Sequence, residues 1–185
     1  RASSSPTIVL LSPSGAPDSY FADTSWTAAA GVAVPGNTTL WTAPAGAELT
    51  PQNPVTLTWD NGAGLVFRKT VTIDDKYMFS VTDTVENTGA AAVTLTPYGR
   101  ILRTGEPHVS GYFIPHEGFI GVLGDAGLEE VTYKSLVEDN GQRGVKEYAP
   151  STGGWLGITD KYWATALVPP AGEAFKSAFE RLQQG

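Results

Sequence analysis

The amino-acid sequence predicts a mainly β protein built from antiparallel sheets, with little helix. Three observations predict this class. Glycine and proline are plentiful, with 21 and 13 residues, and they divide the chain into short segments. Several of these segments alternate apolar and polar residues, which is the period of a half-buried strand. Threonine, valine and aromatic residues recur in them, and these types suit a pleated surface.

The N-terminal part of the chain has the least regular pattern. Residues 1–6 are rich in serine and have no apolar core behind them, so we interpret them as the remnant of a linker. We expect a strand at 7–13, one helical turn around 18–22, and one strand at 38–42. The rest of this part, up to residue 49, is expected to be irregular because proline and glycine interrupt it.

The clearest pattern lies in the middle of the chain. Residues 55–73 read as two strands around a loop that contains Asn-Gly, which is a strong hairpin signal. Residues 76–89 alternate well and end in the turn Asn-Thr-Gly. The next long strand lies within 90–105, where Pro97 indicates a bulge or a sheet edge. Consecutive strands with short turns predict an antiparallel meander of at least four strands.

Residues 153–170 read "GGWLGITDKYWATALVPP". This run is too short for a membrane-spanning helix, which needs about 20 apolar residues. We interpret it as a core hairpin with strands at 155–159 and 162–168, and we expect Trp155 and Trp163 to be mostly buried. A binding platform is the alternative interpretation.

The two segments beside this hairpin are less defined. Residues 138–150 are polar, and we expect them to be exposed. The tail at 173–183 has apolar residues with both helical and strand spacing, so the pattern leaves its structure open between helix and strand.

Charge and composition exclude several function classes. The net charge of −7 repels phosphate backbones, so nucleic acid is not an expected partner. The same charge gains nothing from an anionic membrane surface. The chain has no cysteine, which excludes disulfides and thiolate metal sites. We find no internal repeat, and we expect one domain over residues 7–185.

The only two histidines are the main candidates for chemistry. His108 and His116 lie close in sequence to Glu106 and Glu117, in a segment that two prolines interrupt. Such a set could bind Zn²⁺ or act in acid–base catalysis. Its spacing matches no standard metal motif, so we interpret it as a polar surface loop. The chain also lacks phosphate-binding, dinucleotide-binding and nucleophile motifs, and we predict no metal, no cofactor and no enzyme activity.

A second candidate is a groove on a sheet face. Arg100 and Arg103 follow Pro97 on the strand expected at 90–105, and with Trp59 and Tyr98 they could line a concave surface. Aromatic side chains with an arginine suit a sugar or a peptide. Ordinary sheet packing with arginine stems along the surface is the alternative.

Two stretches of the chain together resemble a known family. They are "VTLTWDNGAGLVFRKTVTIDDKYMFSVTDTVENTGAAAVTLTPYGRI" and "GGWLGITDKYWATALVPP". They resemble the large periplasmic domain of the bacterial membrane protein insertase YidC, over roughly residues 55–168. In that family a Gly-Gly-Trp opens one strand, and the segment that matches Trp163-Ala164-Thr165-Ala166 forms the next.

The resemblance implies a fold and a setting. It implies a β-supersandwich of the galactose-mutarotase-like type, in the periplasm, attached to an inner-membrane parent. Under this resemblance residues 173–183 would be a strand, and the chain would be truncated relative to the full domain. We expect the isolated domain to be monomeric.

The resemblance also implies a role. The domain would be non-catalytic, an accessory or partner-contact domain for membrane protein insertion and folding. Its partners would be Sec translocon components and nascent membrane proteins. Two alternatives on the same fold stay open, a mutarotase-like sugar epimerase and a carbohydrate- or peptide-binding module.

Overall fold

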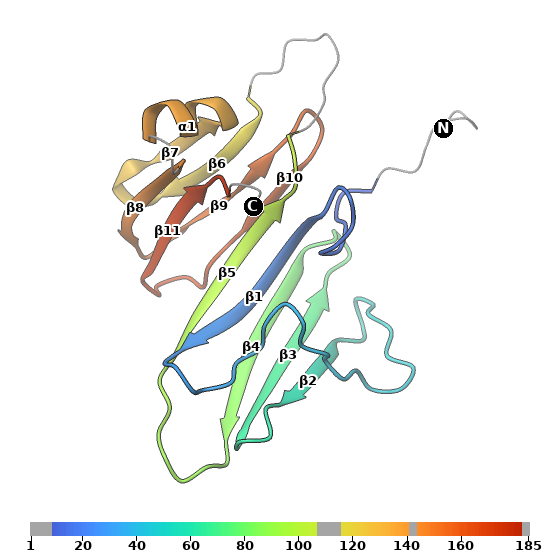
Figure 1. Ribbon diagram of the computed structural model, residues 1–185. Helices are drawn as coiled ribbons and strands as arrows, with labels where there is room; N and C mark the ends of the chain where they lie inside the picture. The colour runs from blue at the N-terminus through green and yellow to red at the C-terminus, as the bar shows by residue number, and fades with distance from the viewer. Residues whose placement is uncertain (1–8, 107–115, 141–143, 183–185) are drawn as a thin grey trace, which may run out of the picture. The chain divides into compact units, whose positions relative to one another are not determined.

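The computed structural model describes residues 9–106, 116–140 and 144–182. These residues form β-strands with one short α-helix and one 3-10 turn (Figure 1). The prediction of a mainly β protein with antiparallel sheets and little helix is confirmed. The chain divides into two compact units. We call residues 23–99 the inserted unit, and residues 1–22 with 100–185 the split unit.

The inserted unit contains a three-stranded antiparallel sheet in the order β2–β3–β4. Its strands are β2 (Val55–Asp60), β3 (Leu65–Ile73) and β4 (Phe79–Asn87). Asn61 shapes the first turn, because its side-chain oxygen accepts hydrogen bonds from the N–H groups of Ala63 and Leu65 at 2.8 and 3.0 Å. Asparagine stabilises turns in this way. The predicted hairpin and the strand that follows it are therefore confirmed.

Strands β1 (Tyr20–Ala28) and β5 (Leu95–Arg103) form a separate two-stranded sheet. Two predictions are wrong here. The helical turn expected around 18–22 is the start of β1, and the expected fourth strand of the meander pairs with β1 instead of β4. Both errors have one cause, since pairing between distant segments leaves no local pattern in the sequence. The position of Pro97 on an edge strand is as predicted.

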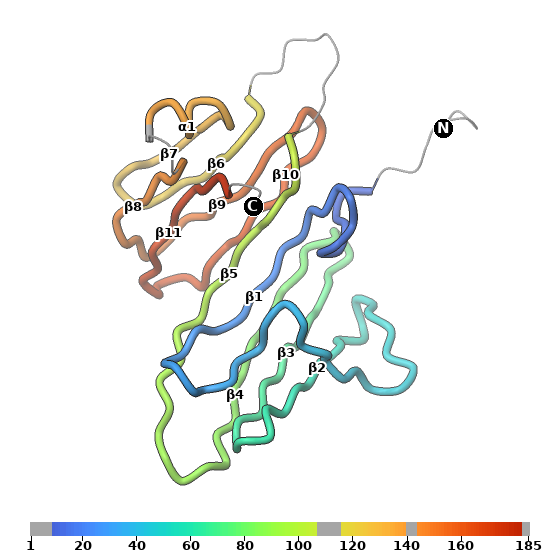
Figure 2. The backbone as a smooth tube through the Cα atoms, viewed as in Figure 1, coloured from blue at the N-terminus to red at the C-terminus, as the bar shows by residue number. Residues whose placement is uncertain are grey.

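Residues 29–54 connect β1 to β2 by a long path, which Figure 2 shows in blue to cyan. The strand expected at 38–42 is wrong, because this stretch contributes only an isolated bridge between Thr42 and Thr58. Proline and glycine along the connection withhold ladder hydrogen bonds or weaken a strand.

The strand expected at 7–13 is also reduced. Its first two residues lie outside the described residues, and the others contribute only an isolated bridge between Ser12 and Tyr20. The run ends at Pro13, which has no N–H group to continue a ladder.

The split unit contains a four-stranded sheet in the order β10–β9–β6–β7 and a separate pair, β11–β8. The sheet is built from β6 (Gly118–Leu123), β7 (Leu128–Thr132), β9 (Gly154–Thr159) and β10 (Ala164–Leu167). The pair is built from β8 (Val145–Ser151) and β11 (Phe175–Glu180). The 3-10 turn at Gly124–Ala126 joins β6 to β7.

The predicted hairpin at 155–168 is confirmed as β9 and β10. Its turn is closed by a hydrogen bond of 2.7 Å from the N–H of Asp160 to the carbonyl of Trp163. Trp163 therefore lies in the turn, and it is 45% exposed. Trp155 is half-buried on β9. The prediction that both are mostly buried is wrong for Trp163, because the turn is longer than two residues.

The segment expected to be exposed and polar contains two regular elements. Helix α1 (Tyr133–Asn140) begins after Thr132, whose side-chain oxygen accepts a hydrogen bond from the N–H of Ser135 at 3.0 Å. This is a helix N-cap. Leu136 fully buries its side chain. After the helix, β8 pairs with β11, so the tail is a strand as the resemblance implies.

Each unit has its own apolar core. In the inserted unit Phe67 is fully buried, with the rings of Trp26 and Trp59 at 5.2 and 5.5 Å. In the split unit Phe119 on β6 stacks on Phe179 of β11 at 5.2 Å. Aromatic pairs at such distances contribute beyond their buried area. The Trp26–Phe67 and Phe119–Phe179 pairs join strands that are distant in sequence.

Glycines allow β6, β9 and β10 to approach closely. A Cβ atom on Gly154, where φ is +113°, would lie 1.9 Å from the carbonyl oxygen of Val122, and one on Gly157 would lie 2.0 Å from that of Thr165. Only glycine fits such positions. This explains the second glycine of Gly-Gly-Trp, Gly154, at the start of the hairpin.

Candidate functional site

The most polar buried group in the split unit surrounds Arg103. Its guanidinium, at the end of β5, forms an ion pair with the carboxylate of Asp160 in the β9–β10 turn. Both side chains are largely buried. The guanidinium also lies over the ring of Tyr20 at 5.0 Å, a distance at which a cation is attracted to an aromatic face.

Two phenols and a second carboxylate complete this group. Burial raises the pKa of Tyr20, and it raises the pKa of Tyr133 to about 12. Burial also raises the pKa of Glu117, and the nearby Asp160 carboxylate raises it further. We call these five residues the Arg103 cluster. Its charges are one guanidinium and two carboxylates, and its phenols stay protonated at neutral pH.

The Arg103 cluster brings together two residues that the sequence placed in different candidates. The sequence predicts Arg103 in the groove and Glu117 in the polar segment that contains the two histidines. His116 is adjacent in sequence, but its Nε2 lies 2.9 Å from the carbonyl oxygen of Phe119. Because a carbonyl oxygen can only accept, Nε2 donates this hydrogen bond, which sets the tautomer and the orientation of the ring. His108 lies outside the described residues.

The cluster has the chemistry of a structural ion pair. The carboxylate of Asp160 is held by the guanidinium of Arg103. Among residues 9–106, 116–140 and 144–182, no three His, Asp or Glu side chains are placed to share a metal ion. The Arg103–Asp160 ion pair has a structural role, because it links the β9–β10 turn to the end of β5.

The four groove residues lie in different units. Trp59 packs on the buried Phe67 at 5.5 Å, and Tyr98 lines a small pocket, both in the inserted unit. Arg100 lies over the ring of Phe21 at 5.8 Å in the split unit. Since Arg100 and Arg103 are three residues apart on β5, they point to opposite faces of that strand. The shared groove stays a prediction.

The pocket at Tyr98 has a volume of about 100 Å³. Its lining includes the aromatic rings of Trp41 and Tyr98 and the polar side chains of Asp23, Asn37 and Lys69. Ligand pockets usually have 300 Å³ or more, so this one suits a few water molecules or a single small side chain.

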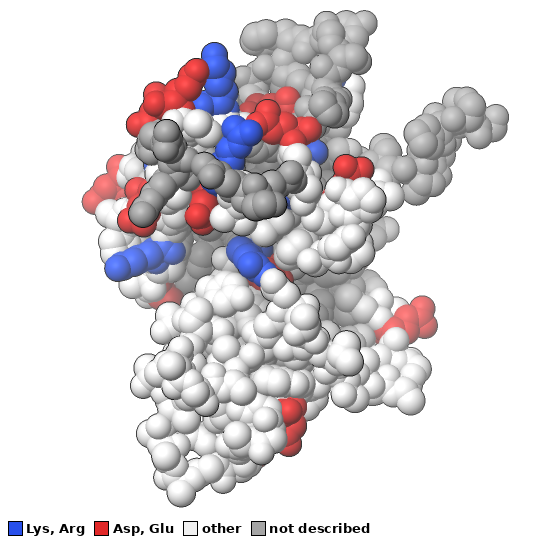
Figure 3. All heavy atoms as spheres, viewed as in Figure 1, with Lys and Arg blue, Asp and Glu red and all other residues white. Residues whose placement is uncertain are grey.

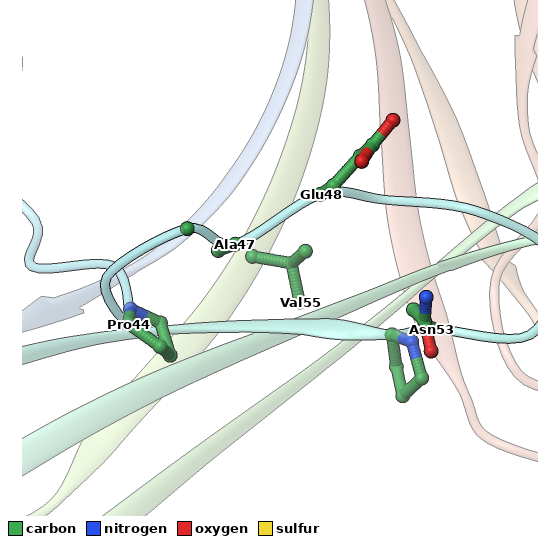
Figure 4. Close-up of a pocket in the computed structure, with 7 residues that line it drawn as sticks. Pro44, Ala47, Glu48, Asn53 and Val55 are labelled. Atoms are coloured by element: carbon green, nitrogen blue, oxygen red, sulfur yellow. The ribbon is translucent and has the colours of Figure 1, made fainter.

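A larger depression lies between the 44–48 loop and the start of β2. Its volume is about 300 Å³. Figure 4 shows Val55 and Ala47 facing each other across it, while the Glu48 carboxylate projects away. Glu48 is the one ionisable residue in its described lining. The depression therefore offers no pair of ionisable groups for catalysis or metal binding.

The strongest surface feature of the inserted unit is an apolar run at the β3–β4 turn. Tyr77, Met78, Phe79 and Val81 follow each other here, and their exposed fractions are 81, 61, 54 and 44%. We call them the β4 apolar run. A contiguous exposed apolar surface marks an interaction site more often than a single exposed residue does.

The turn holds Tyr77 in an unfavourable conformation. Tyr77 has φ of +64°, in the left-handed region. The turn is fixed by Asp74, whose carboxylate accepts hydrogen bonds from the N–H groups of Lys76 and Met78, each at 2.8 Å. A non-glycine residue in this region costs about 1–2 kcal/mol. The turn thus presents an exposed tyrosine at a position that glycine would fill at lower cost.

Charged side chains are unevenly distributed. In the face that Figure 3 shows, red and blue side chains gather over α1 and the strands β6–β11, whereas the region of β2–β4 is largely white. On this face the region of β2–β4 therefore shows few charged side chains. None of the described helices is both long and apolar enough to cross a bilayer.

The β4 apolar run is not among the predicted sites, although the sequence carries a signal for it. The stretch "YMFSVT" has no charge and no proline, while its alternation alone predicts only a strand. The exposure of its apolar face follows from which segments cover the sheet, which no local pattern gives.

Comparisons with known proteins find close relatives. A family model described as the YidC periplasmic domain matches residues 1–185. Relatives named "Membrane protein insertase YidC" include one from Methylobacterium nodulans, 50% identical over 186 residues, and one from Rhizobium johnstonii, 46% identical over 183 residues. Each alignment covers 98% of this chain. The chain spans 30% of the length of each of these relatives.

Proposed function

The chain belongs to the family of YidC periplasmic domains, and from this premise we propose that it serves as a non-catalytic contact domain of a membrane protein insertase. The observation that carries the proposal is the family match along the whole chain, with relatives at about half identity. The proposed location is the periplasm, beside an inner membrane that holds the parent protein.

The proposed role is accessory to insertion itself. A transmembrane segment must enter lipid through a path where its polar backbone groups stay satisfied. The described residues supply strands around apolar cores, with no such path. We therefore place the insertion step in other parts of the parent, and we assign to this domain a transient contact with nascent membrane proteins and with Sec translocon components.

The absence of turnover is part of the same proposal. The arrangement of the ionisable side chains supports it, because the Arg103 guanidinium and the Asp160 carboxylate are paired with each other. An aldose mutarotation assay on the purified chain tests it. We expect the rate of buffer alone. A faster rate that Glu117→Gln abolishes would favour the sugar epimerase instead.

Deletion of residues 1–185 from the parent protein tests the accessory role. We expect the deleted protein to support growth of a strain depleted of its insertase, with slower insertion of some substrates. Immunoblots of membranes must show equal amounts of deleted and intact parent. Loss of growth at equal amounts would contradict the accessory role and place an essential step in this domain.

A further inference from the structure

The outer edge of β4 has no paired strand among the residues that the structure describes, since β4 ends the order β2–β3–β4. The hydroxyl of Thr24 on β1 contacts β4 at Asp83, which lies beyond residues 79–81. A free edge exposes main-chain donors and acceptors, and natural proteins guard such edges with charged residues or proline. Residues 77–82 contain neither. Their sequence combines high β-propensity with no charge, which are the features that favour pairing with another strand.

Two hydrogen bonds establish which main-chain groups face this edge. The N–H of Asp74 donates to the carbonyl of Met78 at 3.0 Å, where the ladder with β3 begins. The N–H of Thr88 donates to the carbonyl of Gly64 at 2.8 Å, where it ends. Residues of an antiparallel strand alternate between bonded and non-bonded pairs. The hydrogen bonds at both ends of the ladder therefore indicate that the main-chain groups of the even-numbered residues of β4 bond to β3.

The main-chain groups of Phe79 and Val81 therefore point to the open edge. Their side chains lie on the same sheet face as Val85, which is opposite the buried Phe67. Val85 is half-buried, whereas Phe79 and Val81 are exposed. The core covering of this face thus ends before these two residues. Unpaired hydrogen-bonding groups and uncovered apolar side chains occur together at the same positions.

We propose that the outer edge of β4, at residues 79–81, binds an extended polypeptide segment as an added strand. The segment would carry apolar side chains at alternate positions, to contact Phe79 and Val81, and basic residues at its ends. This inference rests on the proposed function, because it names the partner of the contact domain. Main-chain hydrogen bonds would supply affinity for many sequences, and the two apolar contacts would supply selectivity.

Charge supports basic ends on the bound segment. The chain carries a net charge of −7, and the exposed turn beside the β4 apolar run holds two acidic residues, Asp74 and Asp75, and one basic residue, Lys76. A basic residue that flanks an uncharged segment would be attracted to this end of the strand. The uncharged centre would meet residues 77–82, which carry no charge.

A second copy of this chain is a poorer occupant. Two copies would each carry a charge of −7, and like charges oppose association. A pairing of a few residues also buries far less than the roughly 1,000 Å² that a stable interface needs. The same small area is sufficient for the transient capture of an extended segment.

Proline at Val81 tests the site with little harm to the fold. The N–H of Val81 faces the open edge, so Val81→Pro removes a donor to the added strand and leaves the bonds to β3 in place. The probe is a fluorescent peptide of alternating valine and threonine with lysine at both ends, titrated into the purified chain. We expect about a tenfold weaker Kd, equivalent to about 1.4 kcal/mol. The control Val81→Thr keeps the donor and should bind within about twofold.

A second probe removes any dependence on the stability of the variant. The same peptide with N-methyl groups on all its residues cannot donate from either edge, and we expect it to lose binding to the unmodified chain. Equal binding of both peptides, or of Val81→Pro and the unmodified chain, would overturn the proposal. So would a dimer of the free chain that Val81→Pro dissociates. A negative result in the peptide assay would not change the expected growth of the deletion strain. The strand-addition proposal and the accessory-role proposal can therefore be rejected independently.

Discussion

Lys69 and Asp83 are cross-strand neighbours on β3 and β4, and their side chains form an ion pair with Nζ 2.7 Å from Oδ1. The two side chains are 15 and 17% exposed. Thr24 of β1 completes the arrangement, because Lys69 donates to its carbonyl at 2.9 Å and its hydroxyl donates to Asp83. A buried pair is tolerated when its remaining donors and acceptors are satisfied in this way.

Breaking this pair should destabilise the inserted unit. We expect Lys69→Met to lower the free energy of unfolding by about 3 kcal/mol, because it leaves the Asp83 carboxylate buried without its partner. Urea unfolding followed by tryptophan fluorescence measures the loss. The matched control is Arg68→Met, which breaks the ion pair between Arg68 and Glu86. These two side chains are 40 and 52% exposed, respectively. Arg68→Met should lower the free energy of unfolding by less than about 1 kcal/mol. An equal decrease in both variants would contradict the burial of the Lys69–Asp83 pair.

Two adjacent glycines should differ sharply in tolerance. We expect Gly154→Ala to lower the free energy of unfolding by about 3 kcal/mol or more, because its Cβ would meet the carbonyl of Val122 and its φ is one that alanine avoids. A Cβ on Gly153 would meet no atom within 4 Å, so Gly153→Ala is the control. Melting temperatures compare them. Similar values for both variants would show that β6 and β9 do not approach as described.

The turn at Tyr77 should be improved by glycine. We expect Tyr77→Gly to raise the free energy of unfolding by about 1 kcal/mol, because it relieves the left-handed conformation. The preceding residue, Lys76, has no positive φ, and Lys76→Gly should lower stability. Chemical denaturation of both variants is the measurement. A loss of stability in Tyr77→Gly would mean that the tyrosine ring makes stabilising contacts that outweigh its backbone strain.

Burial of Tyr133 predicts a dependence of stability on alkaline pH. Its pKa is raised from 10.0 to about 12 in the folded chain. Between these values the unfolded chain loses the phenolic proton and the folded chain keeps it, so stability falls as pH rises through this window. Tyr133→Phe should reduce the slope of stability against pH in this range. Tyr162→Phe, at an exposed side chain, should leave the slope unchanged, and a similar slope in all three proteins would contradict the assignment.

The parts of the fold that the sequence predicts are those with local pairing. The β2–β3 and β9–β10 hairpins follow from alternation and from turn residues such as Asn61. The pairing of β1 with β5 does not follow, because its two strands are separated by the whole three-stranded sheet. Helix α1 was missed although Thr132 and Ser135 form a readable cap, since the helix has only eight residues.

The candidate sites show the same limit. Arg103 and Glu117 were each noticed for their chemistry, but their common neighbour Asp160 lies in a turn and could be placed only by the fold. The β4 apolar run was visible as an uncharged stretch. What the sequence could not give was which side of β4 stays open, because that depends on where the sheet ends.

The discontinuity of the split unit constrains the order in which this chain can fold. A protein that emerges N-terminus first from a translocation pore gains its residues in sequence. The inserted unit is continuous over residues 23–99, so it can collapse as soon as residue 99 has emerged. The described residues before Asp23 belong to a unit whose other part begins at Arg100, so they must wait for that part. The buried Tyr20, which starts β1, therefore remains exposed to proteases and chaperones during this delay, and the delay lengthens with any pause in translocation.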